Sequence, residues 1–163
     1  AYLSDQGLPA NLAAWTLALV GLFNIIGSYS AGVLGGRYVK KNMLALIYLE
    51  RAAVFLAFIL LPKTEVTVLL FGAVLGLLWL STVPPTNSIV AEIFGVRYLA
   101  MLSGFTFFSH QIGSFLGAWL GGRLYDTTGS YDVVWWLAIA LGIAAGLINL
   151  PIDERTIRRP VMA

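Results

Sequence analysis

Three long stretches of the chain contain no charged residue, and this feature restricts the possible folds more than any other. They cover residues 6–36, 66–91 and 133–152. Each can cross a bilayer as a helix, which takes about 20 mostly apolar residues. A membrane-spanning segment must pair its backbone N–H and C=O groups within the protein, which leaves helices or closed barrels. Because apolar and polar residues do not alternate as in strands, the sequence predicts an all-α polytopic membrane helix bundle.

The composition agrees with a membrane environment and excludes several classes of protein. Charged residues make up 11% of the chain, against about 25% in soluble domains. The net charge is +2 and the basic residues form no stripe interleaved with aromatics, which argues against nucleic-acid binding. The chain has no cysteine, one histidine, and no Gly-rich phosphate loop or nucleophile–base pair. We therefore expect no enzyme activity, no metal and no cofactor.

We predict five transmembrane helices, separated by charged or proline-containing segments. The third contains Pro84 and Pro85, which should kink or unwind it, because proline lacks an N–H and its ring clashes with the preceding turn. Residues 1–11 are then an external loop after an earlier helix, residues 12–152 the membrane part and residues 153–163 a tail. Since the chain also begins without Met, we expect a cut through a longer protein. The predicted helices cover residues 12–36, 43–61, 66–93, 98–125 and 133–150.

Basic residues are distributed unequally between the two sides that five helices define. Seven fall on one side, while Lys63 and Arg123 fall on the other. Cytoplasmic loops of membrane proteins carry an excess of Lys and Arg, so we predict that the first side, with the tail, is cytoplasmic. The seven residues are Arg37, Lys40, Lys41, Arg97, Arg155, Arg158 and Arg159.

Glycines recur at spacings of three and four, as in Gly72 and Gly76, which lets neighbouring helices approach closely. We expect tight packing at these positions, although such smooth faces would also let helices rock against each other. Residues 32–38 and 117–125 share a Gly-Gly-Arg pattern and would end on opposite sides of the membrane, as an inverted three-helix repeat requires. The other glycines with this spacing are Gly32, Gly35, Gly36, Gly113, Gly117, Gly121 and Gly122.

His110 lies about 12 residues into the fourth predicted helix, which puts it near the middle of the membrane. Thr106 and Ser114 lie one turn away on either side and complete a polar stripe. Ionisable groups at this depth are costly and are functional candidates for that reason. Because imidazole exchanges a proton near neutral pH, His110 is a candidate for proton coupling and substrate binding. The alternative is a neutral imidazole that is hydrogen-bonded to a neighbouring helix.

Two charged residues, Glu50 and Arg51, interrupt the second predicted helix. Adjacent residues point in different directions around a helix, so these two cannot pair face to face. We expect each to have a structural role, in an interhelical ion pair or by snorkelling to the interface, rather than to bind substrate. Trp79 borders the Pro84–Pro85 break, where it could line a cavity or pack between helices.

Residues 31–41 resemble the cytoplasmic loop signature of the major facilitator superfamily, Gly-x-Leu-x-Asp-Arg-x-Gly-Arg-Arg. Gly36 replaces the signature Asp, to which the family's charge relay is attributed, and Val39 replaces the second Gly. A degenerate copy of this kind is usual in the C-terminal half of the family, which favours helices eight to twelve. The matching residues are Gly32, Leu34, Arg37, Lys40 and Lys41.

Residues 84–132 are similar to helices ten to twelve of the bacterial branch related to monocarboxylate transporters and oxalate/formate antiporters. The resemblance implies a partial major facilitator fold, from which helix seven and the N-terminal half are missing. It also implies that Asn24 and Ser28 stand where monocarboxylate transporters carry an Asp and a substrate-binding Arg. Both are polar and lie one turn apart on one face, but neither is charged.

The resemblance and the polar residues together predict a secondary active transporter in a bacterial inner membrane. It would move a small organic anion, such as a monocarboxylate, by alternating access with proton coupling. A non-transporting scaffold or receptor-like relative with the same fold is the alternative. The predicted partners are the lipid bilayer, the organic solute, and the missing N-terminal half and helix seven. The predicted substrate-binding residues are Asn24, Ser28, Trp79, Thr106 and His110, and the loop motif comprises Gly32, Arg37, Lys40 and Lys41.

Overall fold

The computed structural model describes residues 7–157, which form helices, turns and loops and contain no strand. The first part of the predicted external loop, residues 1–6, and the end of the tail, residues 158–163, lie outside the described residues. Arg158 and Arg159 belong to that last segment. The helices are α2 (Ala10–Gly35), α3 (Lys40–Leu60), α4 (Glu65–Trp79), α5 (Val83–Phe94), α6 (Leu99–Thr128) and α7 (Asp132–Asn149), with a short 3-10 turn, η1 (Val96–Tyr98), before α6.

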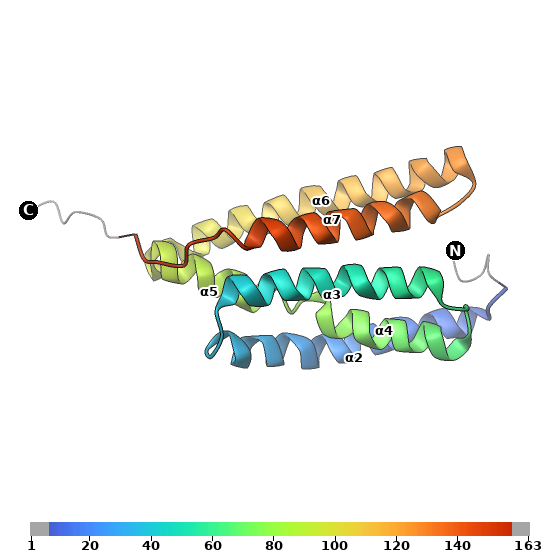
Figure 1. Ribbon diagram of the computed structural model, residues 1–163, viewed down its shortest axis with the longest axis horizontal. Helices are drawn as coiled ribbons and strands as arrows, with labels where there is room; N and C mark the ends of the chain where they lie inside the picture. Colours follow the sequence, from blue (N-terminus) through green and yellow to red (C-terminus); the bar gives the residue numbers. More distant parts are fainter. Residues whose placement is uncertain (1–6, 158–163) are drawn as a thin grey trace, which may run out of the picture.

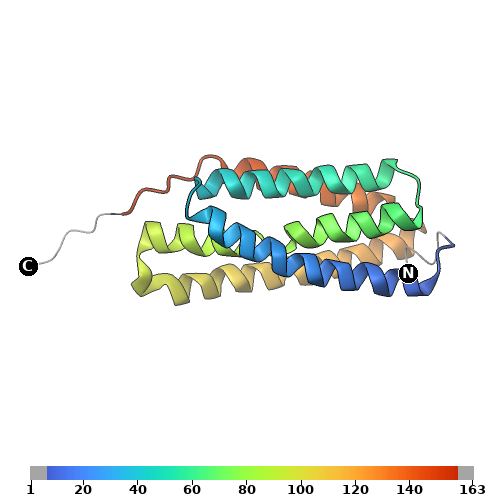
Figure 2. The same ribbon diagram turned by 90° about the horizontal axis from the view of Figure 1, so that it is seen from below.

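The helices form an elongated bundle in which α6 and α7 make one layer and α2 and α4 another, with α3 between them (Figure 1). Seen from below, α3 and α7 lie along one edge and α5 and α6 along the other, with α2 and α4 between (Figure 2). The loops α2–α3 and α5–α6 and the segment after α7 all lie at one end of the bundle (Figure 1). We call this the Lys40 end.

The third predicted span is divided into α4 and α5, with residues 80–82 outside both helices. The break begins before Pro84 and Pro85 because each proline ring clashes with the carbonyl group four residues earlier, at Leu80 and Ser81. The prolines themselves lie in the first turn of α5, where an N–H has no helical partner to lose. The predicted disruption of this helix is therefore confirmed, one turn upstream of the prolines.

Side chains near the α3–α4 loop satisfy the backbone groups that the two helix ends leave unpaired. The Lys63 ammonium group donates to the carbonyl groups of Phe58 and Ile59, at 2.6 and 3.1 Å, at the end of α3. Thr64 and Thr67 form a capping box at the start of α4: each side-chain oxygen accepts from the other residue's N–H, at 3.2 and 2.8 Å. Residues close to the loop in the sequence therefore stabilise the end of α3 and the start of α4.

Glycines of α4 bring that helix close to α2. A Cβ atom at Gly76 would lie 2.5 Å from the carbonyl oxygen of Val20, and one at Gly72 would lie 2.6 Å from the methyl group of Thr16. The predicted close approach is confirmed at these two glycines. It is not seen at Gly113, because apart from the adjacent backbone of its own helix no atom comes within 4 Å of a Cβ there; the same holds for Gly35, Gly117 and Gly122.

Aromatic side chains fill the interior between α3, α4 and α7. Phe58 and Phe71 stack with ring centroids 4.0 Å apart, and the indole of Trp135 lies 5.5 Å from Phe58. Val68 is fully buried beside them, and Leu12 of α2 joins the same cluster. Apolar contacts of this kind hold the end of the bundle opposite the Lys40 end.

Four segments of the described residues are long and apolar enough to cross a membrane, namely Asn11–Gly35, Lys40–Leu60, Glu65–Phe94 and Asp132–Asn149. The helix α6 is the longest, with 30 residues, but polar residues around His110 and Gln111 lower its hydropathy. None of its residues is buried. Several of its large apolar side chains, including Phe105, Phe115 and Trp119, are more than half exposed.

Candidate functional site

The break between α4 and α5 is the point where polar side chains of different helices meet. The carboxamide oxygen of Asn24, on α2, accepts a hydrogen bond of 3.1 Å from the backbone N–H of Leu80. The guanidinium group of Arg51, on α3, donates to the carbonyl groups of Leu78, at 3.1 Å, and Trp79. Two neighbouring helices therefore pair backbone groups that the interrupted helix leaves free.

The sequence predicts an interhelical ion pair or snorkelling for Arg51; the structure instead shows an interhelical contact whose partners are backbone carbonyl groups. Among the described residues no carboxylate forms an ion pair with it. Carbonyl groups at a helix C-terminus carry the negative end of the helix dipole, which favours a cation there. The charge of Arg51 therefore stabilises the end of α4.

Hydroxyl groups near the break are directed to the backbone of their own helices. Ser28 donates to the carbonyl oxygen of Asn24 at 2.8 Å, and Ser81 donates to that of Leu77. A hydrogen bond to the residue four positions earlier satisfies the hydroxyl donor and leaves the oxygen able to accept another bond. Asn24 and Ser28 therefore form a polar strip on α2 that leads to the break, close to Trp79.

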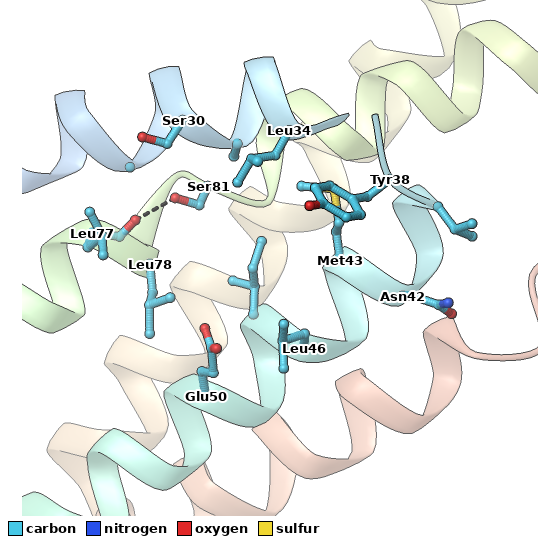
Figure 3. Close-up of a pocket in the computed structure, with 14 residues that line it drawn as sticks. Ser30, Leu34, Tyr38, Asn42, Met43, Leu46, Glu50, Leu77, Leu78 and Ser81 are labelled. Carbon is cyan, nitrogen blue, oxygen red and sulfur yellow. Dashed lines mark hydrogen bonds between the residues drawn. The ribbon is translucent and has the colours of Figure 1, made fainter. Parts of the chain in front are cut away.

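A cavity of about 560 Å³ lies between α2, α3 and the break (Figure 3). Its volume is in the range of small-molecule sites, and most of its lining is apolar. The Glu50 side chain points from α3 into this space (Figure 3). Among residues 7–157, no hydrogen-bond or ion-pair partner of Glu50 is found. The polar side chains of the lining are Ser30, Tyr38, Asn42, Glu50 and Ser81.

The polar stripe predicted on α6 is present, but it lies apart from the break. Thr106 donates to the carbonyl oxygen of Leu102 on its own helix, at 3.0 Å. His110 is exposed, and its ring lies 6.4 Å from that of Phe107. Within the described residues, no hydrogen bond or ring contact joins either residue to Asn24, Ser28 or Trp79. The structure therefore brings together the predicted site residues of α2 and α4, but not those of α6.

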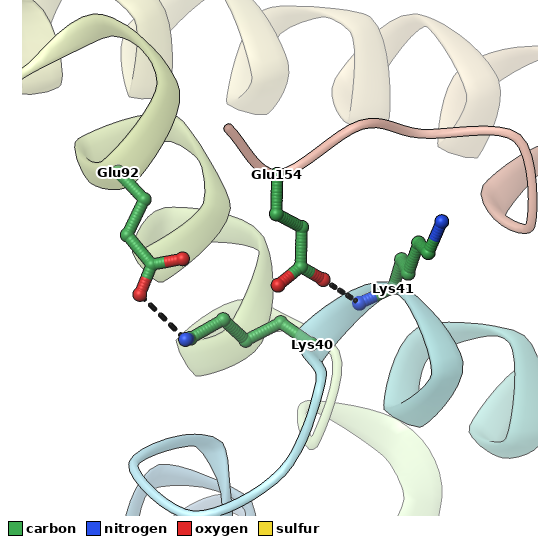
Figure 4. A network of polar contacts seen from close by, with 4 residues as sticks. All are labelled: Lys40, Lys41, Glu92 and Glu154. Atoms are coloured by element: carbon green, nitrogen blue, oxygen red, sulfur yellow. Dashed lines mark hydrogen bonds and ion pairs between the residues drawn. The ribbon is translucent and has the colours of Figure 1, made fainter. Parts of the chain in front are cut away.

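The Lys40 end of the bundle carries an ionic network (Figure 4). The Lys40 ammonium group forms an ion pair of 2.5 Å with Glu92 of α5. The Glu154 carboxylate accepts a hydrogen bond of 2.6 Å from the backbone N–H of Lys41, in the first turn of α3. The Ile157 N–H donates to the carbonyl oxygen of Ile93, so the segment after α7 contacts both α3 and α5.

The remaining residues of the loop motif have simpler surroundings. Gly32 faces Pro84, whose Cβ would lie 3.9 Å from a Cβ at position 32. Arg37 is exposed at the α2–α3 loop. Of the motif residues, Lys40 and the backbone of Lys41 therefore make the polar contacts at this end of the bundle.

Sequence patterns did not identify three contacts of this site: Arg51 with the break, Glu50 with the cavity and Glu154 with α3. Glu50 and Arg51 are charged residues in an apolar span, and this was a signal that each has a special environment, because such charges need a partner or water. The partner of Arg51 is a backbone group, however, and a pattern of residue types in the sequence does not predict a backbone acceptor. Among the described residues, no group of three His, Asp or Glu side chains could hold a metal ion.

Comparisons with known proteins agree with the fold. The model of the family described as Major Facilitator Superfamily matches residues 1–162. Monocarboxylate transporter 12-B of Danio rerio is 25% identical over 150 residues, which cover 90% of this chain and 31% of that protein. Monocarboxylate transporter 12 of Homo sapiens is 29% identical over 83% of this chain and 27% of its own length.

A bacterial relative, the uncharacterized MFS-type transporter YcxA of Bacillus subtilis, is 28% identical over 85% of this chain and 36% of its own length. The chain thus spans about a third of the curated relatives it matches. These relatives are transporters rather than enzymes by name. No solved structure matches the chain at a comparable level of significance.

Proposed function

The chain belongs to the major facilitator superfamily, and from this premise we propose that it is part of a secondary transporter for a small organic anion, such as a monocarboxylate. The names of its relatives support this substrate class. The observation that carries the proposal is the break between α4 and α5, which side chains from α2 and α3 stabilise. Irregular backbone at membrane depth is tolerated where it lines a cavity, and transporters use such discontinuous helices to bind substrates.

The proposed substrate site lies on the open side of this break. Asn24, Ser28 and Trp79 form one wall of it, and Thr106 and His110 on α6 form the other. The two walls do not touch within the described residues, so the proposed site is complete only with helix seven and the N-terminal half of the transporter. Alternating access would then arise as the two halves rock about the site.

We assign the Lys40 end to the cytoplasmic side of a bacterial inner membrane. Arg37, Lys40, Lys41, Arg97 and Arg155 lie at this end, whereas Lys63 and Arg123 lie toward the opposite end. The excess of basic residues in cytoplasmic loops supports this orientation.

Uptake by the full-length protein that contains this chain, reconstituted in liposomes, tests the proposed function. We expect saturable uptake of one or more members of a panel of monocarboxylates and dicarboxylates. Asn24→Ala should weaken substrate binding about tenfold or more, because it removes a hydrogen-bonding group beside a charged ligand. Asn149→Ala is the matched control, since Asn149 donates only to the carbonyl oxygen of Ala145 on its own helix. The absence of any uptake across the panel would favour the scaffold or receptor-like alternative.

Proton coupling is the second part of the proposed function and concerns His110. The imidazole can bind a proton and, when charged, attract the carboxylate of the substrate, so each ligand would favour the other. We expect His110→Gln to abolish accumulation driven by a proton gradient while preserving exchange of substrate across the membrane. Ser109→Ala, beside it on α6, should retain both activities. Accumulation by the His110→Gln variant at the wild-type level would give His110 a structural role only.

A further inference from the structure

A hydrogen bond between two side chains joins α5 to α6. The hydroxyl group of Ser103, on α6, donates to the carboxamide oxygen of Asn87, on α5, at 2.9 Å. By contrast, the hydroxyl groups of Thr106 and Ser109 donate to carbonyl groups of α6 itself. Helices in a membrane gain little from burying apolar surface, so hydrogen bonds between side chains help to fix their contacts. This bond therefore fixes where α6 meets α5.

Ser103 lies on the face of α6 that carries the predicted site residues. Thr106 and His110 follow it by three and seven residues, and residues at these spacings share one side of a helix. At a rise of 1.5 Å per residue, His110 lies about 10 Å farther along the helix than Ser103. The bond to Asn87 therefore holds the polar wall of α6 at the end that lies nearer to α5.

The same side of α5 reaches the other wall of the proposed site. Pro84 lies three residues before Asn87, so the two are neighbours on the helix surface. Pro84 faces Gly32 of α2, since its Cβ lies 3.9 Å from the position that a Cβ would take on that glycine. Gly32 follows Ser28 by four residues, which continues the polar strip of α2 by one turn. One side of α5 thus connects the two walls.

The helix α5 is itself held in place by contacts at the Lys40 end. Glu92 pairs with Lys40 of α3 at 2.5 Å, and the carbonyl oxygen of Ile93 accepts a hydrogen bond of 3.1 Å from the N–H of Ile157. This short helix of 12 residues is therefore attached to α2, α3 and the segment after α7. In contrast, α6 packs on α5 and α7 and has no buried residue. The position of α6 relative to α2 is therefore set through α5.

We propose that Asn87 and Ser103 are positioning residues of the proposed substrate site, and that their hydrogen bond sets the separation of its two walls. A carboxylate bound between the walls needs donors of both within about 3.2 Å of its oxygens. Loss of the bond would let α6 move away from α5, which weakens substrate binding without removing a group that touches the substrate. The inference rests on the proposed function, because that function defines the two walls.

The separation of α6 from the α2–α3 loop can be measured in the full-length protein in lipid nanodiscs. This chain has no cysteine, so spin labels can be attached at Tyr38→Cys in the loop and Met101→Cys in the first turn of α6, once cysteines elsewhere in the protein are replaced. Both positions are exposed. Pulsed electron paramagnetic resonance then gives the distribution of distances between the labels. We expect Ser103→Ala to broaden this distribution and to shift it to longer distances, whereas Ser103→Thr keeps the hydroxyl group and should match the wild type.

Further variants separate the bond from its surroundings. Asn87→Leu removes the acceptor and keeps a side chain of similar size, so it should give the same shift as Ser103→Ala. The double variant should shift no further than either single variant, because both changes break one bond. Thr86→Val is the matched control and should leave the distances unchanged. Thr86 is next to Asn87 on α5, but its hydroxyl group donates to the carbonyl oxygen of Thr82, one turn earlier, at 2.7 Å.

Uptake by the same variants, without the labels, tests the link to the substrate site. For a carboxylate that the wild type takes up, Ser103→Ala should raise the KM about fivefold, the equivalent of one hydrogen bond. The maximal rate should stay close to that of the wild type, because the change weakens binding and leaves every substrate contact in place. Thr86→Val should change neither quantity.

Three results would overturn the proposal: wild-type distances in Ser103→Ala, additive shifts in the double variant, or a shifted distance with an unchanged KM. Absence of uptake by the wild type would count against the proposed function instead. The distance measurements would then still decide whether this bond sets the separation of the two walls.

Discussion

Arg51 donates to two carbonyl groups of a different helix, those of Leu78 and Trp79 at the end of α4. Its planar guanidinium group presents several N–H donors in a fixed arrangement, which a single ammonium group does not. At membrane depth water is scarce, so an unpaired carbonyl group is costly. One side chain of α3 therefore allows α4 to end inside the bundle.

Replacing Arg51 by Met should destabilise the full-length protein. The change keeps most of the apolar stem but leaves two backbone carbonyl groups without a donor, each worth about 1–3 kcal/mol. Lys63→Met is the control, because Lys63 donates to three carbonyl groups, those of Phe58, Ile59 and Leu61, but does so at the end of the bundle, where water can replace it. Thermal unfolding in detergent should show the larger loss for Arg51→Met, and equal losses would contradict this role.

Single residues also show where prediction from the sequence succeeds and fails. The pair Glu50 and Arg51 stands out in the sequence because charges are rare in an apolar span. The partner of Arg51 could not be predicted, because it is a backbone group 27 residues away whose position depends on the whole packing. The separation of His110 from Asn24 and Ser28 likewise depends on which helices stand between them. The roles of these three residues in binding remain predictions.

At the scale of the helices, glycines mark the closest packing, and the tightest of these positions is Gly27 of α2 against the carbonyl oxygen of Leu77 on α4. Gly72 and Gly76 bring α4 onto α2, and Gly142 and Gly146 bring α7 onto α3. Small residues at helix contacts allow the backbones to approach and to gain van der Waals contacts. The spacing of Gly72 and Gly76 alone predicted the close approach of another helix, since glycines four residues apart fall on one helix face.

Gly76→Ala should loosen the contact between α2 and α4. A Cβ at this position would lie 2.5 Å from a backbone oxygen of Val20, which cannot move without shifting the helix. Overpacking of this kind costs about 1–3 kcal/mol. Gly142→Ala should cost less, because its nearest neighbour is the Ala52 side chain at 3.2 Å. The ranking can be measured by thermal unfolding of both variants, and it is refuted if Gly142→Ala is the more damaging.

Local sequence signals predicted the helices well, including the disruption near Pro84 and Pro85. Hydropathy and proline chemistry act over a few residues, so they can be evaluated without the fold. The cap that Glu154 provides for α3 joins residues 113 positions apart, at 2.6 Å between Oε1 and the Lys41 nitrogen. Such a contact exists only after the helices between them have packed.

For the molecule as a whole, the two ends of the bundle differ in charge and in bonding. The Lys40 end carries the ion pair of Lys40 with Glu92 and the contacts of the segment after α7. The opposite end is held by the aromatic cluster around Phe58, Phe71 and Trp135. Ionic contacts at a water-exposed end exchange more easily with solvent than a packed aromatic cluster does.

We expect the Lys40 end to face the cytoplasm in a bacterial host. Reporter fusions to the full-length protein, one after Arg159 and one between residues 127 and 130, measure this directly. The first should report a cytoplasmic location and the second an external one, because basic residues are retained inside. The reverse pattern would invalidate both the orientation and the numbering of the helices.

The uncovered helix α6 has a consequence for biosynthesis. It carries His110 and Gln111 in its middle, has no buried residue and falls short of the apolar character of the other spans. A segment of this polarity enters the lipid phase less readily on its own than α2, which carries no charged residue. At the turn into α7, Tyr125 stacks on Tyr131 with ring centroids 4.4 Å apart. Stable insertion of α6 would therefore wait for α7 to emerge from the ribosome, so the last two spans would enter the bilayer together as a hairpin.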